Sequence, residues 1–257
     1  MNPNLQQKIS VLIITLNEAV HMKPLLDDLK FADEVIIVDS YSTDETKSIA
    51  TSYENVKFIE HKFENYTSQR NFAIDQAKNK WILFIDADER LTPELKLEIL
   101  ETIQNEPVYS AYLVYRTFMF NKKVLRFSGW QTDRIYRLFN KEKARYTIER
   151  LVHEKLDVNG EISFLKHKLI HYSYNDYDVY KGKMISYGKL KAIEAKNKGI
   201  KPNAFHFYIK PAYKFLYQYL IRLGILDGKK GITICYLNAL SVYVRFQELK
   251  KLNTKKY

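Results

Sequence analysis

The chain has 257 residues, 46% of them hydrophobic and only eight of them glycine, so it is long enough for a substantial core and is not a disordered chain. Lys and Arg number 41 against 30 Asp and Glu, and the net charge of +11 predicts an anionic partner: nucleotide phosphates, nucleic acid or an anionic membrane surface. The single cysteine, Cys235, excludes an internal disulfide framework and fits a reducing compartment.

Strand and helix patterns alternate four times in the first hundred residues. We expect strands at 9–15, 34–39, 56–59 and 81–85, each followed by a helix, with the third helix at 65–77. Ser42 and Glu45 form a capping box for the second helix, and Thr92 with Pro93 begins the fourth. This alternation predicts an α/β fold with helices on both faces of the sheet.

Polar residues follow three of these strands. They are Thr15-Leu16-Asn17-Glu18, Asp39-Ser40 and Asp86-Ala87-Asp88. Ligands of open α/β sheets bind at the carboxyl ends of the strands, so we expect these segments to converge. The carboxylates of Asp86 and Asp88 are hard ligands suited to Mg²⁺ or Mn²⁺, although a polar turn that ends a strand gives the same pattern.

A nucleotide at this edge needs its phosphates neutralised without a glycine-rich loop, because neither G-x-G-x-x-G nor G-x-x-x-x-G-K-[ST] occurs. A divalent ion on the acidic pair, aided by a basic residue such as Arg70, meets that need. Two alternatives stay open: Asp39 as a turn or helix-capping residue, and Arg70 as a solvated helix residue.

In order and spacing, these motifs resemble the N-terminal half of family 2 glycosyltransferases of the GT-A fold. The matching segments within residues 8–100 are Thr15-Leu16-Asn17-Glu18, 38–44, Gln69-Arg70-Asn71 and Asp86-Ala87-Asp88. The chain is also similar to bacterial lipopolysaccharide core β-1,4-glucosyltransferases over most of its remaining length. The resemblance implies a GT-A (Rossmann-like) mixed sheet and a UDP-sugar donor.

The resemblance also implies roles for the donor-site residues. Thr15, Glu18 and Asp39 would contact the uracil or ribose, Asp86 the ribose or the metal, and Asp88 the metal on the diphosphate. The same site would include Leu16, Asn17, Ser40, Arg70 and Ala87.

The second half of the chain carries candidate acceptor residues. Between strand patterns at 109–115 and 135–139, Trp130 lies close to Asp133 and Arg134, which suits a sugar face, although Trp130 as a plain core residue is the alternative. Glu154 follows His153 in an otherwise apolar strand, and spacing alone also allows it to be a strand-edge residue paired with a neighbouring cation. The resemblance implies that Glu154 is the catalytic base of an inverting transfer, and His153 is either a contact to the acceptor or diphosphate or a structural histidine.

The C-terminal part is basic and rich in aromatic residues. We expect a hairpin turn at Asn159-Gly160, a helix from about 176 to 198 that Gly199 ends, and a further helix from Phe205 to Leu223. In this last helix a basic stripe, Lys210, Lys214, Gln218 and Arg222, recurs every four residues within an apolar surface. The stripe predicts an interfacial helix on an anionic membrane, and packing on the catalytic domain or on a second subunit is the alternative.

We therefore predict a glycosyltransferase domain at 1–174, with a nucleotide-sugar half at 1–100 and an acceptor half at 101–174, and a helical, basic extension at 175–257. The longest uncharged stretch, 231–244, is too short to span a membrane, and the apolar run at 9–16 is too short for a signal peptide. We expect a cytoplasmic enzyme, peripheral on the inner face of the cytoplasmic membrane.

The predicted reaction moves a hexose, with glucose from UDP-glucose expected, to a lipopolysaccharide core or other glycolipid or glycan acceptor, without a nucleic-acid partner. Three alternatives differ in chemistry. A nucleotidyltransferase usually needs the missing glycine-rich loop, and a phosphatase would carry the acidic pair on its first strand rather than its fourth. A nucleic-acid-binding protein would follow from the charge of +11 and the 20 tyrosines.

Overall fold

The computed structural model describes residues 7–105, 108–121, 123–150, 153–174 and 177–254, which divide into two compact units. Met1–Arg116 with Arg134–His171 form the sheet unit, and Thr117–Asp133 with Tyr172–Tyr257 form the helical unit. The second part of the helical unit begins near the domain boundary expected at residue 174. The sequence did not predict that the segment 117–133 belongs to it.

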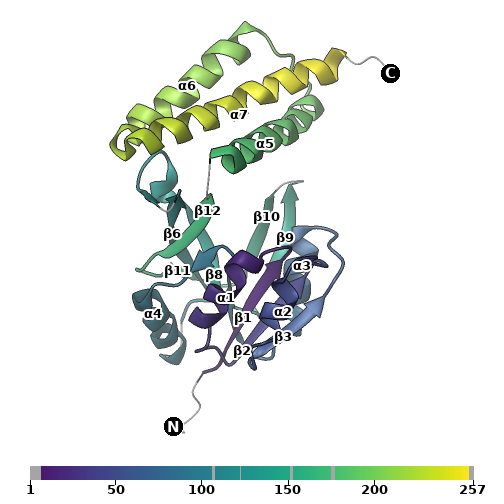
Figure 1. The fold of residues 1–257 in the computed structure, drawn as a ribbon, viewed down its shortest axis with the longest axis vertical. Coiled ribbons are helices and arrows are strands. Elements are labelled where there is room, and N and C mark those ends of the chain that lie inside the picture. Colours follow the sequence, from purple (N-terminus) through teal and green to yellow (C-terminus); the bar gives the residue numbers. More distant parts are fainter. Residues whose placement is uncertain (1–6, 106–107, 122, 151–152, 175–176, 255–257) are drawn as a thin grey trace. The chain divides into compact units, whose positions relative to one another are not determined.

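The secondary structure follows the predicted alternation through the first hundred residues (Figure 1). The strands are β1 (Ile9–Thr15), β2 (Glu34–Asp39), β3 (Val56–Glu60), β4 (Trp81–Phe84), β5 (Glu89–Arg90), β6 (Ala111–Phe120), β7 (Lys123–Leu125), β8 (Arg134–Asn140), β9 (Ala144–Arg150), β10 (His153–Val158), β11 (Ile162–Phe164) and β12 (Leu169–Tyr174). The helical segments are α1 (Ala19–Asp28), α2 (Thr46–Ala50), α3 (Tyr66–Gln76), α4 (Pro93–Gln104), η1 (Trp130–Thr132), α5 (Tyr177–Asn197), η2 (Phe205–Ile209), α6 (Lys210–Leu216), η3 (Tyr217–Ile221), η4 (Gly224–Asp227) and α7 (Lys229–Thr254).

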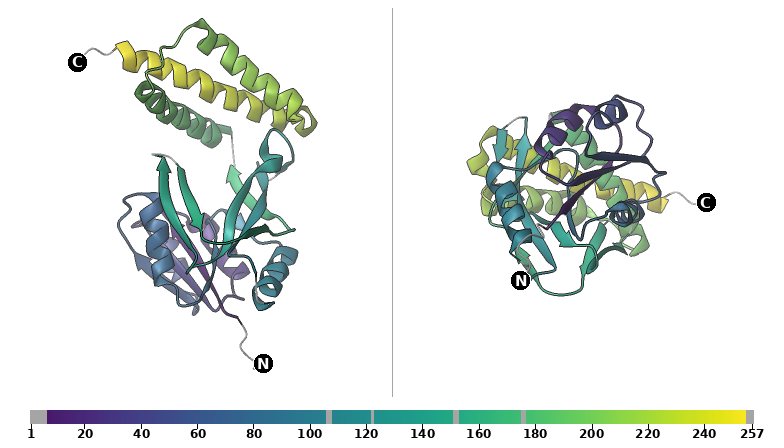
Figure 2. Two further views of the ribbon diagram at one scale, coloured as in Figure 1. Left: turned by 180° about the vertical axis from the view of Figure 1, so that it is seen from behind. Right: turned by 90° about the horizontal axis from the view of Figure 1, so that it is seen from below.

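The sheet is mixed, as predicted. Its strand order is β3-β2-β1-β4-β8-β6-β12-β5. The first four strands of that order are parallel to one another, whereas β8 is antiparallel to both β4 and β6. A separate antiparallel pair, β9 and β10, lies beside α3, where the Asn71 side chain bonds to the backbone of Tyr146 at both its amide and its carbonyl (Figure 2).

Strand β1 runs through the middle of the core. Val11 and Ile13 pack into one apolar cluster with the side chains of α1 and α4, and Leu12 packs into a second cluster with Ala73 and Ile74 of α3. Successive side chains of a strand point to opposite faces, so one β-branched run fills both layers. The prediction of helices on both faces is confirmed.

Two local predictions are wrong. Ser42 does not cap the second helix, because α2 begins at Thr46 and both the amide and the hydroxyl of Ser42 donate to the carboxylate of Asp39. Asn159-Gly160 does not close a hairpin, because β10 pairs with β9 and β11 pairs in parallel with β6. For Ser42 the competing acceptor is Asp39, only three residues earlier, whereas at Asn159-Gly160 β11 pairs with β6, a strand distant in sequence.

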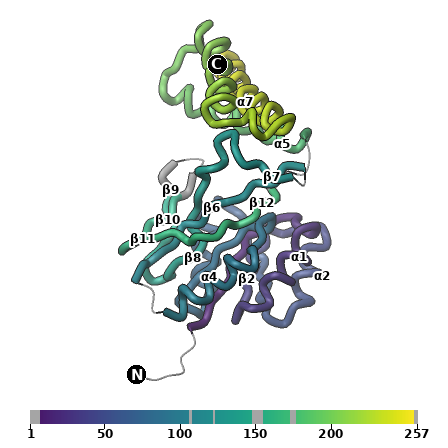
Figure 3. Tube along the Cα trace, turned by 90° about the vertical axis from the view of Figure 1, so that its left-hand side faces the viewer, coloured from purple at the N-terminus to yellow at the C-terminus, as the bar shows by residue number. Residues whose placement is uncertain are grey.

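In the helical unit, α7 lies between α5 and the segment formed by η2, α6 and η3 (Figures 1 and 3). Helices α5 and α7 approach closely at Gly188, where a Cβ atom would lie 2.7 Å from the carbonyl oxygen of Ser241. The segment 117–133 joins this unit through Asp227, whose carboxylate accepts bonds from the amides of Arg126 and Phe127 at 3.0 and 2.9 Å.

The basic stripe of the sequence faces the interior of the helical unit, which corrects the expectation that it meets headgroups. Lys210 Nζ lies 5.2 Å from the centre of the Phe246 ring, Gln218 is only 8% exposed, and Arg222 donates to Thr132 Oγ1 at 2.7 Å. The outward face of η2, α6 and η3 is apolar instead. Its exposed residues are Phe205, Tyr208, Ile209, Tyr213, Leu216, Tyr217, Leu220 and Ile221. Within the described residues, every helix is too short or too polar to cross a membrane.

Candidate active site

The three polar segments predicted from the sequence lie together at one edge of the sheet unit. Strands β2, β1 and β4 are neighbours and parallel, with Thr15 opposite Asp39 in the register. The amide of Ser40 donates to Thr15 O at 2.9 Å, and the amide of Ile85 donates to Leu12 O at 3.0 Å. The structure therefore brings the segments at 15–18, 39–40 and 86–88 to the same edge.

The first two segments form a connected loop. Asn17, in a left-handed conformation with φ of 56°, accepts a bond from the amide of Thr43 at 2.8 Å. Its own amide donates to Ser42 Oγ at 2.7 Å. Asp39 is buried and accepts two bonds from Ser42, so its carboxylate holds the loop in the way the turn alternative described. A carboxylate has about four acceptor positions, so the two bonds from Ser42 leave Asp39 able to accept others. A ribose contact by Asp39 stays a prediction.

Arg70 is not a solvated helix residue. Its side chain is buried, with Cζ 4.7 Å from the centre of the Phe84 ring. Its guanidinium donates from Nη2 to Asp86 Oδ1 at 3.2 Å and from Nη1 to the hydroxyl of Tyr146 at 3.5 Å. Helix α3 therefore fixes a cation beside the first carboxylate of the acidic pair.

Two residues that the sequence analysis did not single out complete this network. Arg137 of β8 is 1% exposed and binds both Asp86 and Glu89, the latter at 2.6 Å. Glu89 is fully buried, and Arg116 Nη1 lies 3.4 Å from it. The signal in the sequence was a lone arginine in the apolar strand 135–139 and a glutamate directly after the acidic pair.

The carboxylates that pair with these arginines are held in their ionised form. Burial alone would raise the pKa of Asp86, but Arg137 and then Arg70 outweigh it and hold that pKa well below its usual range. In the described part of the chain, Nε and Nη1 of Arg137 have no hydrogen-bond partner. Arg70, Arg116 and Arg137 surround these two carboxylates, and guanidinium groups are the preferred protein partners of phosphate.

Asp88 has a different environment. Its side chain is 28% exposed, and Oδ2 lies 3.1 Å from Nε2 of His171. Burial raises the pKa of Asp88. The hydrogen bond and the charge of His171 lower it, and the net pKa lies below the usual value, so the carboxylate stays ionised. Burial and then the charges of Asp88 and Asp44 raise the pKa of Glu18, which shows that negative potential accumulates around Asp88.

These residues fit an open metal site rather than a closed one. Among the described residues there is no group of three or more acidic, His or Cys side chains that would hold an ion by itself. Asp86 is engaged by two arginines, whereas Asp88 is partly exposed and lies in the region of negative potential. A divalent ion here would need oxygen ligands from a bound molecule, as Mg²⁺ does when it binds substrate phosphates.

The predicted catalytic base lies in β10 of the sheet unit. The pairing of β9 and β10 shifts register between His153 and Glu154, and such a bulge redirects side chains and is frequent beside active sites. The side chains of these two residues lie outside the described part of the structure. Beside the strands β9 and β10 is a cavity of about 370 Å³, lined by Arg70 of α3 and by residues of several strands, including Arg134, Tyr136, Tyr146 and Lys155.

The tentative acceptor residues fall into both units. Arg134 is exposed in the sheet unit, with Cζ 5.3 Å from the centre of the Phe164 ring. Trp130 and Asp133 belong to the helical unit, where the Trp130 ring packs 4.2 Å from that of Phe118. Packing of Trp130 was the alternative that the sequence left open.

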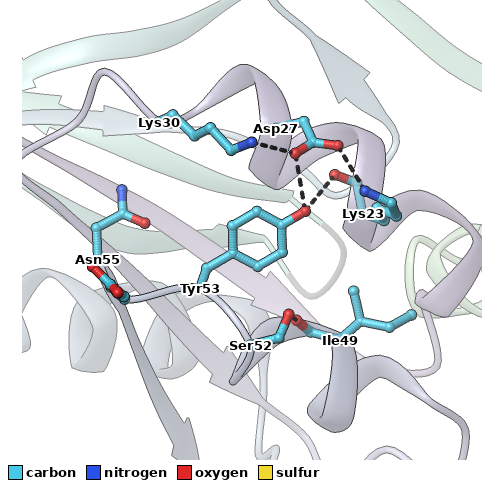
Figure 4. Close-up of a pocket in the computed structure, with 8 residues that line it drawn as sticks. Lys23, Asp27, Lys30, Ile49, Ser52, Tyr53 and Asn55 are labelled. Atoms are coloured by element: carbon cyan, nitrogen blue, oxygen red, sulfur yellow. Dashed lines mark hydrogen bonds and ion pairs between the residues drawn. The ribbon is translucent and has the colours of Figure 1, made fainter.

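A second hollow of the sheet unit, of about 610 Å³, lies between α1 and the loop after α2 (Figure 4). Its charges satisfy one another, because Asp27 binds Lys23 at 3.1 Å and Lys30 at 2.8 Å and accepts from the Tyr53 hydroxyl at 3.1 Å. Asn55 in its wall precedes β3, so the hollow lies at the amino edge of the sheet, away from the acidic strand ends. We assign it no part in the site.

A mixed sheet whose parallel strands end in carboxylates, with paired arginines behind them, defines the sheet unit as a GT-A-type nucleotide-sugar fold. Comparisons with known proteins agree. Residues 10–157 match the model of glycosyl transferase family 2. An uncharacterized glycosyltransferase of Rickettsia bellii is 31% identical over 98% of this chain and 90% of its own length. The chain belongs to glycosyltransferase family 2 and is a glycosyltransferase.

The expected likeness to lipopolysaccharide core enzymes is confirmed as well. The lipopolysaccharide core biosynthesis glycosyltransferase LpsC of Rhizobium meliloti is 27% identical over 92% of both chains. Among solved structures, the mannosyltransferase PcManGT of Pyrobaculum calidifontis, in complex with GDP-Man and Mn²⁺, superposes with a TM-score of 0.56 at 14% identity, covering 99% of this chain and 89% of its own. At that identity the likeness shows the fold alone.

Proposed function

We propose that this glycosyltransferase moves a hexose, with glucose from UDP-glucose as the expected donor, to a lipopolysaccharide core or another glycolipid or glycan acceptor. The observation that carries the proposal is the meeting of three polar strand ends beside the buried arginine network of Asp86. An acidic pair next to buried guanidinium groups suits a nucleotide diphosphate. The relationship to LpsC supports a lipopolysaccharide core acceptor.

In the donor site, the loop of residues 15–18 and Asp39-Ser40 would hold the uracil and ribose, with Ala87 in the strand end beside them. Asp88 would hold Mg²⁺ or Mn²⁺, with Asp86 beside it, and the ion would supply positive charge to the diphosphate. PcManGT was solved with Mn²⁺, which supports a divalent metal. We assign Arg70 to the same diphosphate, because Asp86 keeps its guanidinium in place.

The transfer needs one base. The oxygen of an acceptor hydroxyl forms a bond to the anomeric carbon, the bond from that carbon to the diphosphate oxygen breaks, and UDP leaves with the electron pair. The hydroxyl proton passes to the carboxylate of Glu154, and attack opposite the leaving group inverts the anomeric configuration. His153 and Arg134 are the residues of the sheet unit that we propose to orient the acceptor. Trp130 and Asp133, the other predicted acceptor residues, belong to the helical unit.

Calorimetric titration of UDP, UDP-glucose and GDP, with and without Mn²⁺, tests the donor site. We expect metal-dependent UDP binding that Asp88→Asn weakens at least tenfold, whereas Asp27→Asn, at the opposite edge of the sheet, leaves it unchanged. Glu154→Gln should keep UDP-glucose binding and lose turnover by about a hundredfold or more. Equal UDP affinity in wild type and Asp88→Asn would remove Asp88 from the site, and tighter binding of GDP would reject the uridine donor.

We further propose that the enzyme is cytoplasmic and peripheral on the inner face of the cytoplasmic membrane. The support is the exposed apolar face of η2, α6 and η3, together with the exposed lysines Lys201 and Lys229 on either side of this stretch. Apolar side chains enter the headgroup region, and nearby cations favour anionic lipids. This arrangement differs from the predicted basic stripe, because the apolar side of the helix points outward.

Flotation with liposomes tests this surface in the full chain. We expect binding to vesicles rich in phosphatidylglycerol, weak binding to neutral vesicles, and at least tenfold weaker binding when Tyr213→Ser and Leu216→Gln are combined. Leu97→Gln, at an exposed leucine of α4 in the sheet unit, is the matched control. Equal flotation of the double variant and wild type would reject the apolar face as the contact.

A further inference from the structure

The inward-facing polar residues of the helical unit line a cavity of about 530 Å³. Its walls come from the segment 128–133, from α5, from α6 with η3, and from α7. Trp130, Tyr187 and Met184 supply aromatic and apolar surface, and Lys214, Gln218 and Arg245 supply polar groups. A cavity of this size with mostly apolar walls and a few polar groups has the character of a small-molecule site.

Three polar atoms in this wall are buried without a hydrogen-bond partner among the described residues. They are Nε1 of Trp130, Oε1 of Gln218 and Nε of Arg245. Gln218 is 8% exposed, so water does not freely solvate it. Buried polar groups are nearly always paired in folded proteins, so three unpaired atoms on residues that line one cavity are unusual.

Two cations that the proposal uses, Lys214 of α6 and Arg245 of α7, line this cavity. Burial, followed by the charge of Arg245, lowers the pKa of Lys214, as expected for a cation without an adequate counterion. An anionic group in the cavity would relieve this repulsion.

The wall is held in place by contacts outside the cavity. Gln131 accepts from the amide of Gly129 at 2.9 Å and donates to Arg222 O at 3.1 Å. Gly129 has φ of +98°, and a Cβ atom there would lie 3.3 Å from Nε2 of Gln218. The π-helical turn η3 carries Gln218, closed by the bond from the amide of Arg222 to Tyr217 O at 2.9 Å, and such turns are frequent at functional sites. The cavity is therefore preformed.

We propose that this cavity is a second binding site, for a sugar that carries a phosphate or carboxylate. The anion would meet Lys214 and Arg245, the ring hydroxyls would meet Gln218 and the Trp130 indole N–H, and an aromatic face would cover the C–H side of the ring. The binding stands independently of the donor site. Only the step that makes this sugar a part of the acceptor rests on the proposed function.

Titration of the full chain with glucose 6-phosphate, glucose and inorganic phosphate tests the proposal. We expect glucose 6-phosphate to bind at least tenfold more tightly than either of the other two, because only it uses both halves of the site. Lys214→Met should weaken that binding at least tenfold. Lys229→Met, at an exposed lysine that begins α7, should leave it unchanged.

Two further measurements separate the possible causes of a negative result. Gln218→Leu should weaken glucose 6-phosphate binding and leave phosphate binding unchanged. All variants should keep UDP affinity, and their circular dichroism melts should match wild type, which shows that the helical unit folds. Equal binding of glucose 6-phosphate and phosphate, or unchanged binding in Lys214→Met, would overturn the proposal. Lys214-dependent binding of phosphatidic acid vesicles without binding of glucose 6-phosphate would also overturn it, in favour of a lipid headgroup. Absence of UDP binding by the wild type would contradict the proposed donor site, but it would not bear on the proposed sugar-phosphate site of the helical unit.

Discussion

Replacement of Arg137 by Met tests whether the buried ion network supports the sheet unit. Arg137 is 1% exposed and its partner Glu89 is fully buried, with 2.6 Å between Nη2 and Oε1. Removing the cation leaves Glu89 with Arg116 at 3.4 Å and the amide of Asp86 at 3.1 Å, and it leaves Asp86 with Arg70 at 3.2 Å. Breaking a buried pair from one side costs about 3–5 kcal/mol, a large fraction of the roughly 5–15 kcal/mol that stabilises a domain.

The assay is urea unfolding followed by tryptophan fluorescence in a Trp130→Phe background, so that Trp81, 3% exposed in β4, reports on the sheet unit alone. Arg145→Met is the control, because its ion pair with Asp75 at 2.7 Å is half exposed and such pairs contribute about 0–1 kcal/mol. Adding Glu89→Gln to Arg137→Met should recover about 1–3 kcal/mol. A loss in Arg137→Met no larger than in the control would refute the reasoning.

Three further predictions concern the helical unit. Gly188→Ala should lower the unfolding free energy of the helical unit by about 1–3 kcal/mol, because the new methyl group meets Ser241 O at 2.7 Å. Gly182→Ala, with open space around it, should raise that free energy by about 0.5–1 kcal/mol. Thermal melting by circular dichroism compares the two variants. Asp227→Ala should cost on the order of 1–3 kcal/mol in the same assay, because it leaves two partly buried amides without this acceptor. Burial and the charge of Arg245 lower the pKa of Lys214, so the unfolded chain binds that proton more tightly than the folded chain. Stability should therefore rise with pH between the folded pKa of Lys214 and about 10.4. In a series of thermal melts, Lys214→Met should remove this rise, and an unchanged slope would contradict the prediction.

Local sequence patterns were sufficient for most of the sheet unit. The apolar run Ile9–Thr15 predicted a strand buried on both faces, and Thr92 with Pro93 predicted the start of α4. These signals lie within a few residues of the element that they specify. The approach of the polar strand ends also followed from sequence, because parallel strands bring their carboxyl ends to one edge.

The tertiary structure decided which partners each polar group meets. Ser42 carries a helix-capping signal, yet Asp39 takes its hydroxyl, and Arg137 reads as one charge in an apolar strand, yet it pairs with Asp86 and Glu89, which lie far from it in sequence. Spacing every four residues placed Lys214 and Gln218 on one side of a helix. It did not say which side faces outward, because that depends on the apolar area that α5 and α7 offer to the opposite side.

The sequence by itself thus determined the four parallel strands of the sheet, the meeting of its polar strand ends and the family. Those features depend on backbone periodicity and on short motifs, which are properties of neighbouring residues. Only the tertiary structure decided the buried arginine network, the membership of 117–133 in the helical unit and the inward direction of Lys214 and Gln218. Each of these depends on pairing between residues far apart in the chain, where burial makes a satisfied partner worth more than any local preference.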